Sequence, residues 1–483
     1  ASLLQVTNAA NSGNINMERI TQPMYRYDFT YWHSPVNQSS GFTLGNLSPL
    51  TLSDKYFSWT PSVGGASGIW IAETSASVMD HRKGYIVRAP QTYSTNPAVK
   101  VPYTGNFIGV PNNGNIVCPI GYGSMGPTAT DDKWNLLGNP YPSAVSAASF
   151  LNDPANAAAI DGTIYLWTHN TPWSTAWPDP FYANYVINYT SADYASWNKT
   201  GGVGTIASSG GPAPNGYIAA GEAFFVKSLG VPGTATFKNS MRVADNNSQF
   251  FKINPSIVNE QVMERHRIWL NFTNESGSFN QLLVGYVTGA TLGWDRGIDG
   301  TRLSTSDVTF YSIIPEDKLV IQGRPLPFQN NDVVPLGYTS LSTGNFTIRL
   351  DHVDGLFVNQ AIYLEDKYLN VIHDLKQNPY EFLTEAGIFD DRFVLRYSNL
   401  AFETISEAKI DASALIKEET LNVQASKGIV QITIYDLTGK LIHEYKPQEL
   451  SSFFKAPFLH ANGAYLAKIE MENGSLCMKK IIN

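Results

Sequence analysis

Apolar and polar residues alternate with a period of two along most of the chain, which predicts β-strands rather than helices. In residues 1–254, short apolar runs are separated by clusters of Gly, Pro, Asn and Ser, and helical spacing is confined to residues 143–151. The strands expected in this segment are residues 24–29, 56–59, 68–72, 84–88, 134–137, 163–167 and 223–227. The pattern therefore predicts an all-β fold.

The expected strands become longer and more regular beyond residue 255, where we place a domain boundary. They are residues 267–273, 281–287, 308–312, 318–322, 333–337, 344–350, 361–365, 371–375, 380–383 and 392–397. Strands at this spacing are typical of a β-sandwich, of which the jelly roll is one form. Residues 255–400 are predicted to be a middle β-sandwich, and residues 401–415, which lack strand patterning, a linker.

Residues 1–254 are predicted to form an N-terminal β-rich passenger domain. Residues 416–483 are predicted to form a third, smaller β-sandwich after the middle domain. Residues 428–435 alternate as a strand and lead into a turn that ends at Gly439. Two further strands, 464–470 and 475–482, are joined by Asn473 and Gly474, the dipeptide that most favours a tight hairpin turn. The chain thus divides into three β-domains.

Four short motifs follow one another in this last segment: residues 434–442, 462–469, 472–474 and 479–483. Together they resemble the C-terminal sorting domain of type IX secretion system cargo proteins in Bacteroidetes, which implies an immunoglobulin-like fold. The closing motif is similar to both type A and type C sorting signals, and the preceding β-domain favours type C. Further resemblances are to the domain that precedes such sorting domains, in residues 268–274, 294–300 and 391–397, and to large surface proteins of flavobacteria, in residues 137–143 and 160–170.

The resemblance implies export through the periplasm and outer membrane to the cell surface or the extracellular medium. The partners that it implies are the translocon channel, its shuttle protein, and a sortase-like peptidase that removes the domain and links the passenger to anionic lipopolysaccharide. The residues expected to serve translocon recognition are Tyr435, Asp436, Gly439, Asn462, Gly463, Asn473, Gly474, Lys479 and Lys480. A basic edge strand can pair with carboxylates or extend a receptor's sheet; the alternative for the two lysines is a solvated strand end.

Composition agrees with a well-folded protein: 43% of the 483 residues are hydrophobic and only 15% are charged. The net charge of -8 argues against a nucleic-acid partner, and no apolar run reaches the roughly 18 residues of a transmembrane helix. Because Ala1 is not preceded by an initiating Met or a leader, we expect a removed signal peptide or a fragment. Cys118 and Cys477 are predicted to be free thiols; a disulfide in an oxidising envelope is the alternative.

The residues give little support to catalysis. A glycosidase needs two carboxylates on either side of the scissile bond, and three close pairs occur: Asp351 with Asp354, Glu365 with Asp366, and Asp390 with Asp391. Each pair is expected at a strand end or turn, where Asp commonly caps a loop. The dispersed histidines show no zinc spacing, and neither a nucleophile elbow nor a phosphate-binding loop occurs. We therefore predict no catalytic residue and no cofactor.

Two weaker ligand sites complete the list of candidates. Asp295 and Asp299 in the loop 294–300 are weak candidate calcium ligands; the alternative is an Asp-capped loop with Arg296 paired to a carboxylate. Aromatic residues that include Trp167, Trp173 and Trp177 are candidate carbohydrate contacts, with core packing as the alternative. The prediction is an adhesin-like, non-catalytic surface cargo protein. The alternative is the C-terminal part of a secreted polysaccharide-degrading enzyme or a carbohydrate-binding protein.

Overall fold

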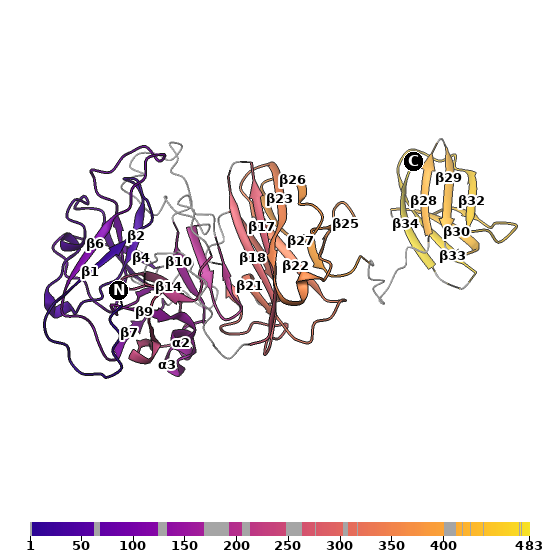
Figure 1. Ribbon diagram of the computed structural model, residues 1–483. Coiled ribbons are helices and arrows are strands. Elements are labelled where there is room, and N and C mark those ends of the chain that lie inside the picture. Colours follow the sequence, from indigo (N-terminus) through magenta and orange to yellow (C-terminus); the bar gives the residue numbers. More distant parts are fainter. Residues whose placement is uncertain are drawn as a thin grey trace. The chain divides into compact units, whose positions relative to one another are not determined.

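The computed structural model describes residues 2–61, 68–123, 133–168, 193–204, 213–247, 263–275, 277–302, 308–315, 317–399, 412–417, 419–425, 427–437, 439–472, 474 and 476–483. The chain divides into two compact units, Ala1–Asn399 and Leu400–Asn483, both built from β-sheets (Figure 1). The all-β, multi-domain expectation is confirmed. Within the described ranges, no helix has the length and apolar character needed to cross a membrane.

The N-terminal part of the first unit consists of several small antiparallel sheets. Its strands are β1 (Ile15–Ile20), β2 (Phe29–Trp32), β3 (Tyr56–Thr60), β4 (Ile69–Glu73), β5 (Tyr85–Arg88), β6 (Thr104–Gly109), β7 (Ile116–Ile120), β8 (Trp134–Gly138), β9 (Ala144–Ser146), β10 (Ile164–Trp167), β11 (Tyr194–Trp197), β12 (Gly202–Val203), β13 (Tyr217–Ile218), β14 (Ala223–Lys227), β15 (Gly233–Phe237) and β16 (Arg242–Val243). The helices are α1 (Leu44–Leu47), α2 (Ala147–Asn152) and α3 (Pro154–Ala157). Two sheets dominate, with orders β2-β5-β3-β4 and β12-β11-β10-β14-β8.

The helix expected over residues 143–151 begins later than the sequence predicts. Residues 144–146 form β9, which pairs with both β13 and β16, so this segment is drawn into a sheet. Helix α2 starts after Ser146, whose side-chain oxygen accepts a hydrogen bond from the backbone N–H of Ser149 at 3.2 Å. Such a cap satisfies one of the N–H groups left unpaired at a helix start.

An aromatic core fills the space between the two larger sheets of the N-terminal part. Tyr31 of β2 stacks on Trp167 of β10 with ring centroids 5.1 Å apart, and its hydroxyl is hydrogen bonded to that of Tyr194 at 2.6 Å. The buried members of this core are Phe29, Tyr31, Phe57, Trp70, Ile86, Trp134, Leu136, Tyr165, Trp167, Tyr194, Ala223 and Phe225. Because rings from both sheets interlock, the two sheets form one packed body.

The middle part is a β-sandwich made by one long sheet that curls back on itself. Its strands are β17 (Arg265–Asn274), β18 (Phe279–Val287), β19 (Gly300–Thr301), β20 (Thr309–Ile313), β21 (Lys318–Arg324), β22 (Val333–Ser340), β23 (Gly344–Val353), β24 (Tyr363–Asp366), β25 (Val371–Asp374), β26 (Tyr380–Thr384) and β27 (Gly387–Arg396). The order is β25-β24-β27-β22-β20-β21-β18-β17-β23-β26, with β18 and β21 parallel. Side chains from both ends of this path share one core, which includes Leu270, Phe272, Leu364 and Leu395.

The N-terminal and middle parts are packed into a single unit, although the sequence places a boundary near residue 255. That boundary falls among residues 248–262, which lie outside the described ranges. The two parts are joined by direct hydrogen bonds: Trp269 donates from Nε1 to the carbonyl of Gly202 at 2.8 Å, and Thr163 donates from its hydroxyl to the carbonyl of Asp299 at 3.1 Å. These bonds tie β12 and the segment before β10 to the middle sandwich.

In its described residues the second unit is a seven-stranded β-sandwich with its own core. Its strands are β28 (Ala412–Lys417), β29 (Thr420–Ala425), β30 (Ile429–Asp436), β31 (Leu441–Tyr445), β32 (Phe453–Pro457), β33 (Ala464–Met471) and β34 (Leu476–Ile482). They form the sheets β28-β29-β32 and β31-β30-β33-β34. Strand β28 begins at Ala412, inside the predicted linker 401–415, because residues 412–417 pair with β29 along their whole length. Residues 401–411 of that linker lie outside the described ranges. Cys118 and Cys477 are both free.

Candidate functional site

Three of the expected recognition residues lie at the turn between β30 and β31. Tyr435 and Asp436 end β30, and the Asp436 side chain accepts a hydrogen bond from the backbone N–H of Lys440 at 3.0 Å. Gly439 has a φ of 86°, a conformation that costs glycine little, and its N–H donates to the Asp436 carbonyl at 3.1 Å. The contacts of Asp436 and Gly439 are those of a tight turn.

Asn462 and Gly463 lie at the same end of the four-stranded sheet. Gly463 and Asn483 exchange two backbone hydrogen bonds, at 3.2 and 3.0 Å, which hold the segments beyond β33 and β34 together. Asp436 lies opposite Tyr465 in the β30–β33 register, so the turn after β30 and the segment before β33 lie at the same end of the sheet. Gly474 belongs to the hairpin at the opposite end of β33 and β34, and Asn473 lies outside the described residues.

The two lysines of the last motif point to opposite sides of β34. Lys479 lies opposite the buried residue Ala467 and is half-buried on the core side of the sheet. Lys480 lies opposite Leu466 and is exposed on the outer side. Successive side chains of a strand alternate between faces, so a single surface cannot present both lysines equally.

Sequence reasoning missed three apolar residues on the outer side of β34. Leu476, Met478 and Ile482 are 57%, 53% and 68% exposed. The signal was present in the sequence, because residues 476–482 carry apolar side chains at both alternating positions of the strand. A strand that is apolar on both faces is expected where both faces are covered, yet among the described residues of this unit the core takes side chains from one face of β34, such as Ile481.

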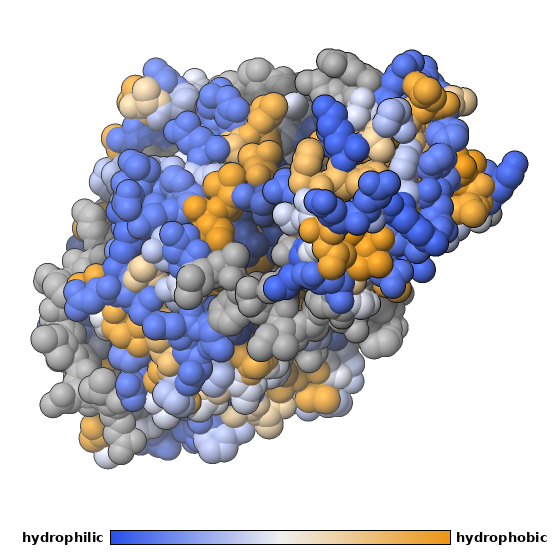
Figure 2. All heavy atoms as spheres, turned by 90° about the vertical axis from the view of Figure 1, so that its right-hand side faces the viewer, coloured by the Kyte–Doolittle hydropathy of each residue, from blue (hydrophilic) through white to orange (hydrophobic). Residues whose placement is uncertain are grey.

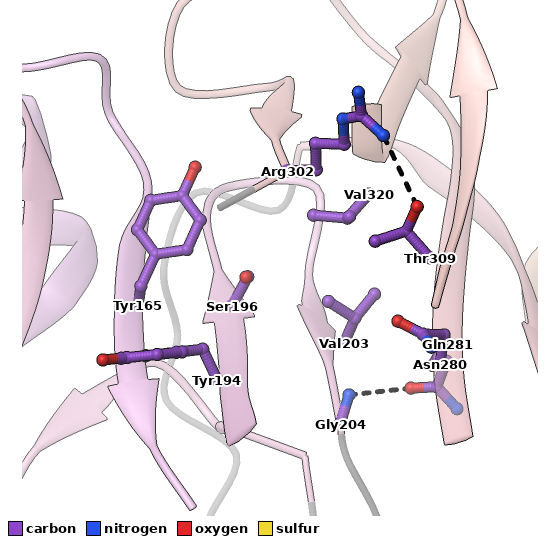
Figure 3. Close-up of a pocket in the computed structure, with 10 residues that line it drawn as sticks. All are labelled: Tyr165, Tyr194, Ser196, Val203, Gly204, Asn280, Gln281, Arg302, Thr309 and Val320. Atoms are coloured by element: carbon purple, nitrogen blue, oxygen red, sulfur yellow. Dashed lines mark hydrogen bonds between the residues drawn. The ribbon is translucent and has the colours of Figure 1, made fainter. Parts of the chain in front are cut away.

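A small cavity lies in the first unit, where the sheet of the N-terminal part meets the middle sandwich (Figure 3). Its volume is about 30 Å³, and a single water molecule needs roughly 10 to 15 Å³ of such space. The cavity therefore has room for about two water molecules and is too small for a sugar ring. The lining residues are Tyr165, Tyr194, Ser196, Val203, Gly204, Asn280, Gln281, Arg302, Thr309 and Val320.

The polar groups around this cavity mostly bond to one another across the junction. The Gly204 N–H donates to Oε1 of Gln281 at 2.8 Å, and Arg302 lies 3.4 Å from the hydroxyl of Thr309 (Figure 3). Arg302 also covers the ring of Tyr311 at 4.8 Å. Arg302 is the one charged side chain among the ten lining residues, so these residues supply no carboxylate or imidazole for acid–base chemistry.

The structure corrects the carbohydrate contact expected at Trp167. Its side chain is 7% exposed, one face of its indole stacks on Tyr31, and its Nε1 donates to the carbonyl of Phe29 at 2.9 Å. A sugar needs an open aromatic face for stacking, and this ring is part of the core instead. Trp173 and Trp177 lie outside the described residues.

The candidate calcium ligands in the loop 294–300 are occupied by backbone groups. Asp299 is 1% exposed, and its two carboxylate oxygens accept hydrogen bonds from the N–H groups of Asp295, at 2.6 Å, and Gly323, at 2.7 Å. Burial raises the pKa of Asp299 to about 7, although both hydrogen bonds act in the opposite direction. In the part of the chain that the structure describes, no three His, Cys, Asp or Glu side chains are grouped so as to hold a metal ion.

Arg296 binds backbone carbonyls instead of the carboxylate expected from the sequence. Its Nε donates to Ile160 at 2.9 Å and its Nη2 to Leu151 at 3.1 Å. Both acceptors belong to the N-terminal part of the unit. The loop therefore joins the two parts of the first unit.

The three pairs of neighbouring carboxylates are tied to structural partners. Asp366 is fully buried and forms an ion pair with Arg392 at 2.8 Å, while its neighbour Glu365 pairs with Arg396 on the other side of β24. Neighbouring residues of a strand point to opposite faces, so Glu365 with Asp366, and Asp390 with Asp391, cannot flank one bond. The remaining contacts are Asp354 with Arg267, Asp351 with His352, Asp390 with Lys318 and Asp391 with Tyr368.

Two matches to family models follow the division of the chain into units. The first unit is an all-β structure in which the N-terminal part, built from small sheets, and the middle β-sandwich are packed together. Residues 1–397 match the family described as "Domain of unknown function (DUF8693)", and the chain belongs to this family. Residues 400–483 match "Domain of unknown function (DUF8694)". The boundary between the two matches coincides with the boundary between the two compact units.

Comparisons with individual proteins add little. A search of curated proteins returns no match for this chain. Among solved structures, the chain is similar to a "Biofilm associated protein - BSP domain" at 8% sequence identity, with 100% of this chain and 98% of that chain covered. The TM-score is 0.13, so this likeness supports no conclusion about fold or function.

Proposed function

We propose that the chain is a cargo protein of a Bacteroidetes type IX secretion system and that residues 400–483 are its sorting domain. The observation that carries this proposal is the separate unit with its own core, formed by residues such as Leu421, Ile432, Ile434, Ala467 and Ile469. A sorting signal that is read as a folded module must keep its fold whatever passenger precedes it. A self-contained core provides that independence.

In this proposal the partners are the outer-membrane translocon channel and its shuttle protein, and then a sortase-like peptidase. Residues 1–399 are the passenger, carried to the cell surface or the extracellular medium, and act there as an adhesin-like, non-catalytic domain. The non-catalytic assignment is supported by the engagement of the neighbouring carboxylates in ion pairs and hydrogen bonds, as at Asp366 with Arg392.

A reporter experiment tests the sorting role. Residues 400–483 are fused to the C-terminus of a fluorescent protein that carries an inner-membrane export signal, and the fusion is expressed in a Bacteroidetes strain with a type IX system. We expect protease-accessible fluorescent protein at the cell surface or in the medium. The matched controls are the same fusion without residues 400–483 and the same strain without the translocon channel, which should both retain the reporter in the periplasm. Equal surface delivery in either control would refute the proposal.

A further inference from the structure

The outer face of β33 and β34 carries apolar side chains that the described residues of the second unit leave exposed, Leu476, Met478 and Ile482. The core of this unit takes Ala467, Ile469 and Ile481, so the alternate residues of both strands point away from it. In the register of the hairpin, Glu470 lies opposite Leu476, Lys468 opposite Met478, Leu466 opposite Lys480 and Ala464 opposite Ile482. Facing side chains in such pairs are roughly 5 Å apart, so these eight residues form one continuous patch, here called the outer hairpin face.

Two of the three charged residues on this face, Lys468 and Lys480, are cationic and the third is Glu470, which favours a partner that carries carboxylates. Lys468 and Lys480 lie among the exposed apolar side chains, and the ion pair that the structure records in the described residues of the second unit, Lys446 with Glu444, involves neither of them. The protein surface in Figure 2 shows hydrophobic side chains in small groups among hydrophilic ones. Exposed apolar residues that are rimmed by charge commonly mark interaction sites.

We propose that the outer hairpin face is the surface by which the second unit docks onto its receptor protein in the outer membrane. The receptor surface is inferred to be apolar opposite Leu476, Met478 and Ile482, with carboxylates opposite Lys468 and Lys480. This inference rests on the proposed sorting function and names the face that is read. Strand β34 also ends its four-stranded sheet, and β28 of the other sheet lies near it, with the thiol of Cys477 3.7 Å from the carbonyl of Ala412.

Two other occupants fit the face less well. A second copy in a two-fold contact places the same patch against itself, so Lys468 at its centre would meet its own copy. An anionic lipid surface would attract the two lysines but repel Glu470, which lies on the same face. A receptor protein can place carboxylates against the two lysines and a hydrogen-bond donor against Glu470, which a uniformly anionic surface cannot do.

Binding of the full chain to the purified outer-membrane shuttle protein of a type IX system tests the inference. One variant combines Leu476→Ser, Met478→Ser and Ile482→Ser, and another combines Lys468→Glu and Lys480→Glu. We expect each to raise the dissociation constant by about tenfold or more, since buried anchor residues dominate interface energy. The matched controls change exposed residues elsewhere in the unit: Leu450→Ser, Phe453→Ser and Leu459→Ser in one variant, Lys427→Glu and Lys455→Glu in the other. These controls should bind as the unmodified chain does.

The reporter assay and the binding assay together distinguish a wrong docking face from a wrong sorting function. If the reporter with residues 400–483 is exported but the face variants bind the shuttle protein as tightly as the controls, the inference is overturned and the sorting function stands. If phosphatidylglycerol vesicles, or a second copy in sedimentation, capture the chain through the same residues while the shuttle protein does not, the inferred partner is wrong. If the reporter is not exported, the sorting function and this inference both fall. Unchanged thermal unfolding of the variants confirms that the changes act on binding.

Discussion

Arg296 donates a hydrogen bond to the backbone carbonyl of Ile160 at 2.9 Å, across the junction between the middle sandwich and the N-terminal part. The same guanidinium reaches the carbonyl of Leu151 at 3.1 Å, and the N–H of Gly297 donates to the carbonyl of Asp161 at 3.2 Å. Backbone carbonyls that are buried at a junction need donors, and this loop supplies them. The contacts join residues about 140 positions apart into one unit.

Replacing Arg296 with Met should destabilise the first unit by about 2 to 4 kcal/mol, because the change leaves two carbonyls without their charged donor. The measurement is the free energy of unfolding in urea, followed by tryptophan fluorescence. Arg349→Met is the matched control, since Arg349 is an exposed residue of β23 and surface changes usually stay within about 0.5 kcal/mol. Equal effects of the two changes would show that the loop does not join the two parts.

The buried carboxylates predict a pH dependence of stability. Burial raises the pKa of Glu222 to about 8 from a usual value near 4.5, although Arg19 and the N–H of Ala219 act in the opposite direction. The folded state therefore holds a proton that the unfolded state releases, so stability from this group is complete below about pH 4.5 and is lost as the pH rises through about 8. Asp161 and Asp299, with pKa values raised to about 6 and 7, act in the same direction.

Glu222→Gln should flatten this profile, because the amide does not titrate. We expect the melting temperature of the unmodified chain to fall from about pH 5 to about pH 9 relative to that of the variant, with the largest difference in slope at about pH 6 to 7, between the pKa values of the unfolded and folded states. Glu381→Gln, at an exposed position of β26, should leave the profile unchanged. Parallel profiles for the unmodified chain and Glu222→Gln would contradict the assignment.

Calcium should not stabilise the chain through the loop 294–300. Both oxygens of Asp299 are already held by backbone N–H groups, and calcium requires six to eight oxygen ligands, in round numbers. We expect the melting temperature in millimolar calcium to equal that in EDTA. Asp299→Asn should lower it in both conditions by the equivalent of about 2 kcal/mol, because the new amide N–H group faces a backbone donor. If calcium raised the melting temperature of the unmodified chain but not that of Asp299→Asn, the loop would be a calcium site after all.

The alternation of apolar and polar residues predicted most strands but not how the sheets pack into compact units. Residues 56–59 lie in β3, and residues 85–88 of the expected strand 84–88 form β5, because local alternation and turn residues suffice to define such strands. Of the expected strand 24–29, only Phe29 lies in a strand, β2: the N–H of Asp28 donates to the carbonyl of Tyr25 at 3.1 Å, and this turn is not visible in the apolar pattern.

The candidate sites were harder to predict because exposure depends on partners far away in the sequence. Trp167 occupies the core because Tyr31 and Phe29 lie beside it, 136 and 138 positions away. The outer hairpin face could be predicted in part, since the apolar character of residues 476–482 on both sides of a strand indicates a second contact. Which side would remain open depended on β28 and β30, whose placement the sequence does not reveal.

Gly439 should act on sorting through its turn rather than through direct contact with a receptor. It has a φ of 86°, and a Cβ built at this position would meet nothing within 4 Å, so only backbone strain opposes a side chain there. Gly439→Val should therefore destabilise the second unit by about 1 to 2 kcal/mol, whereas Gly439→Asn, which tolerates this conformation, should cost less. The measurements are the thermal unfolding of the second unit and surface delivery of the reporter. We expect Gly439→Asn to retain delivery and Gly439→Val to lose it only in proportion to its unfolding. Lost delivery in a fully folded Gly439→Asn variant would assign the residue to the receptor contact instead.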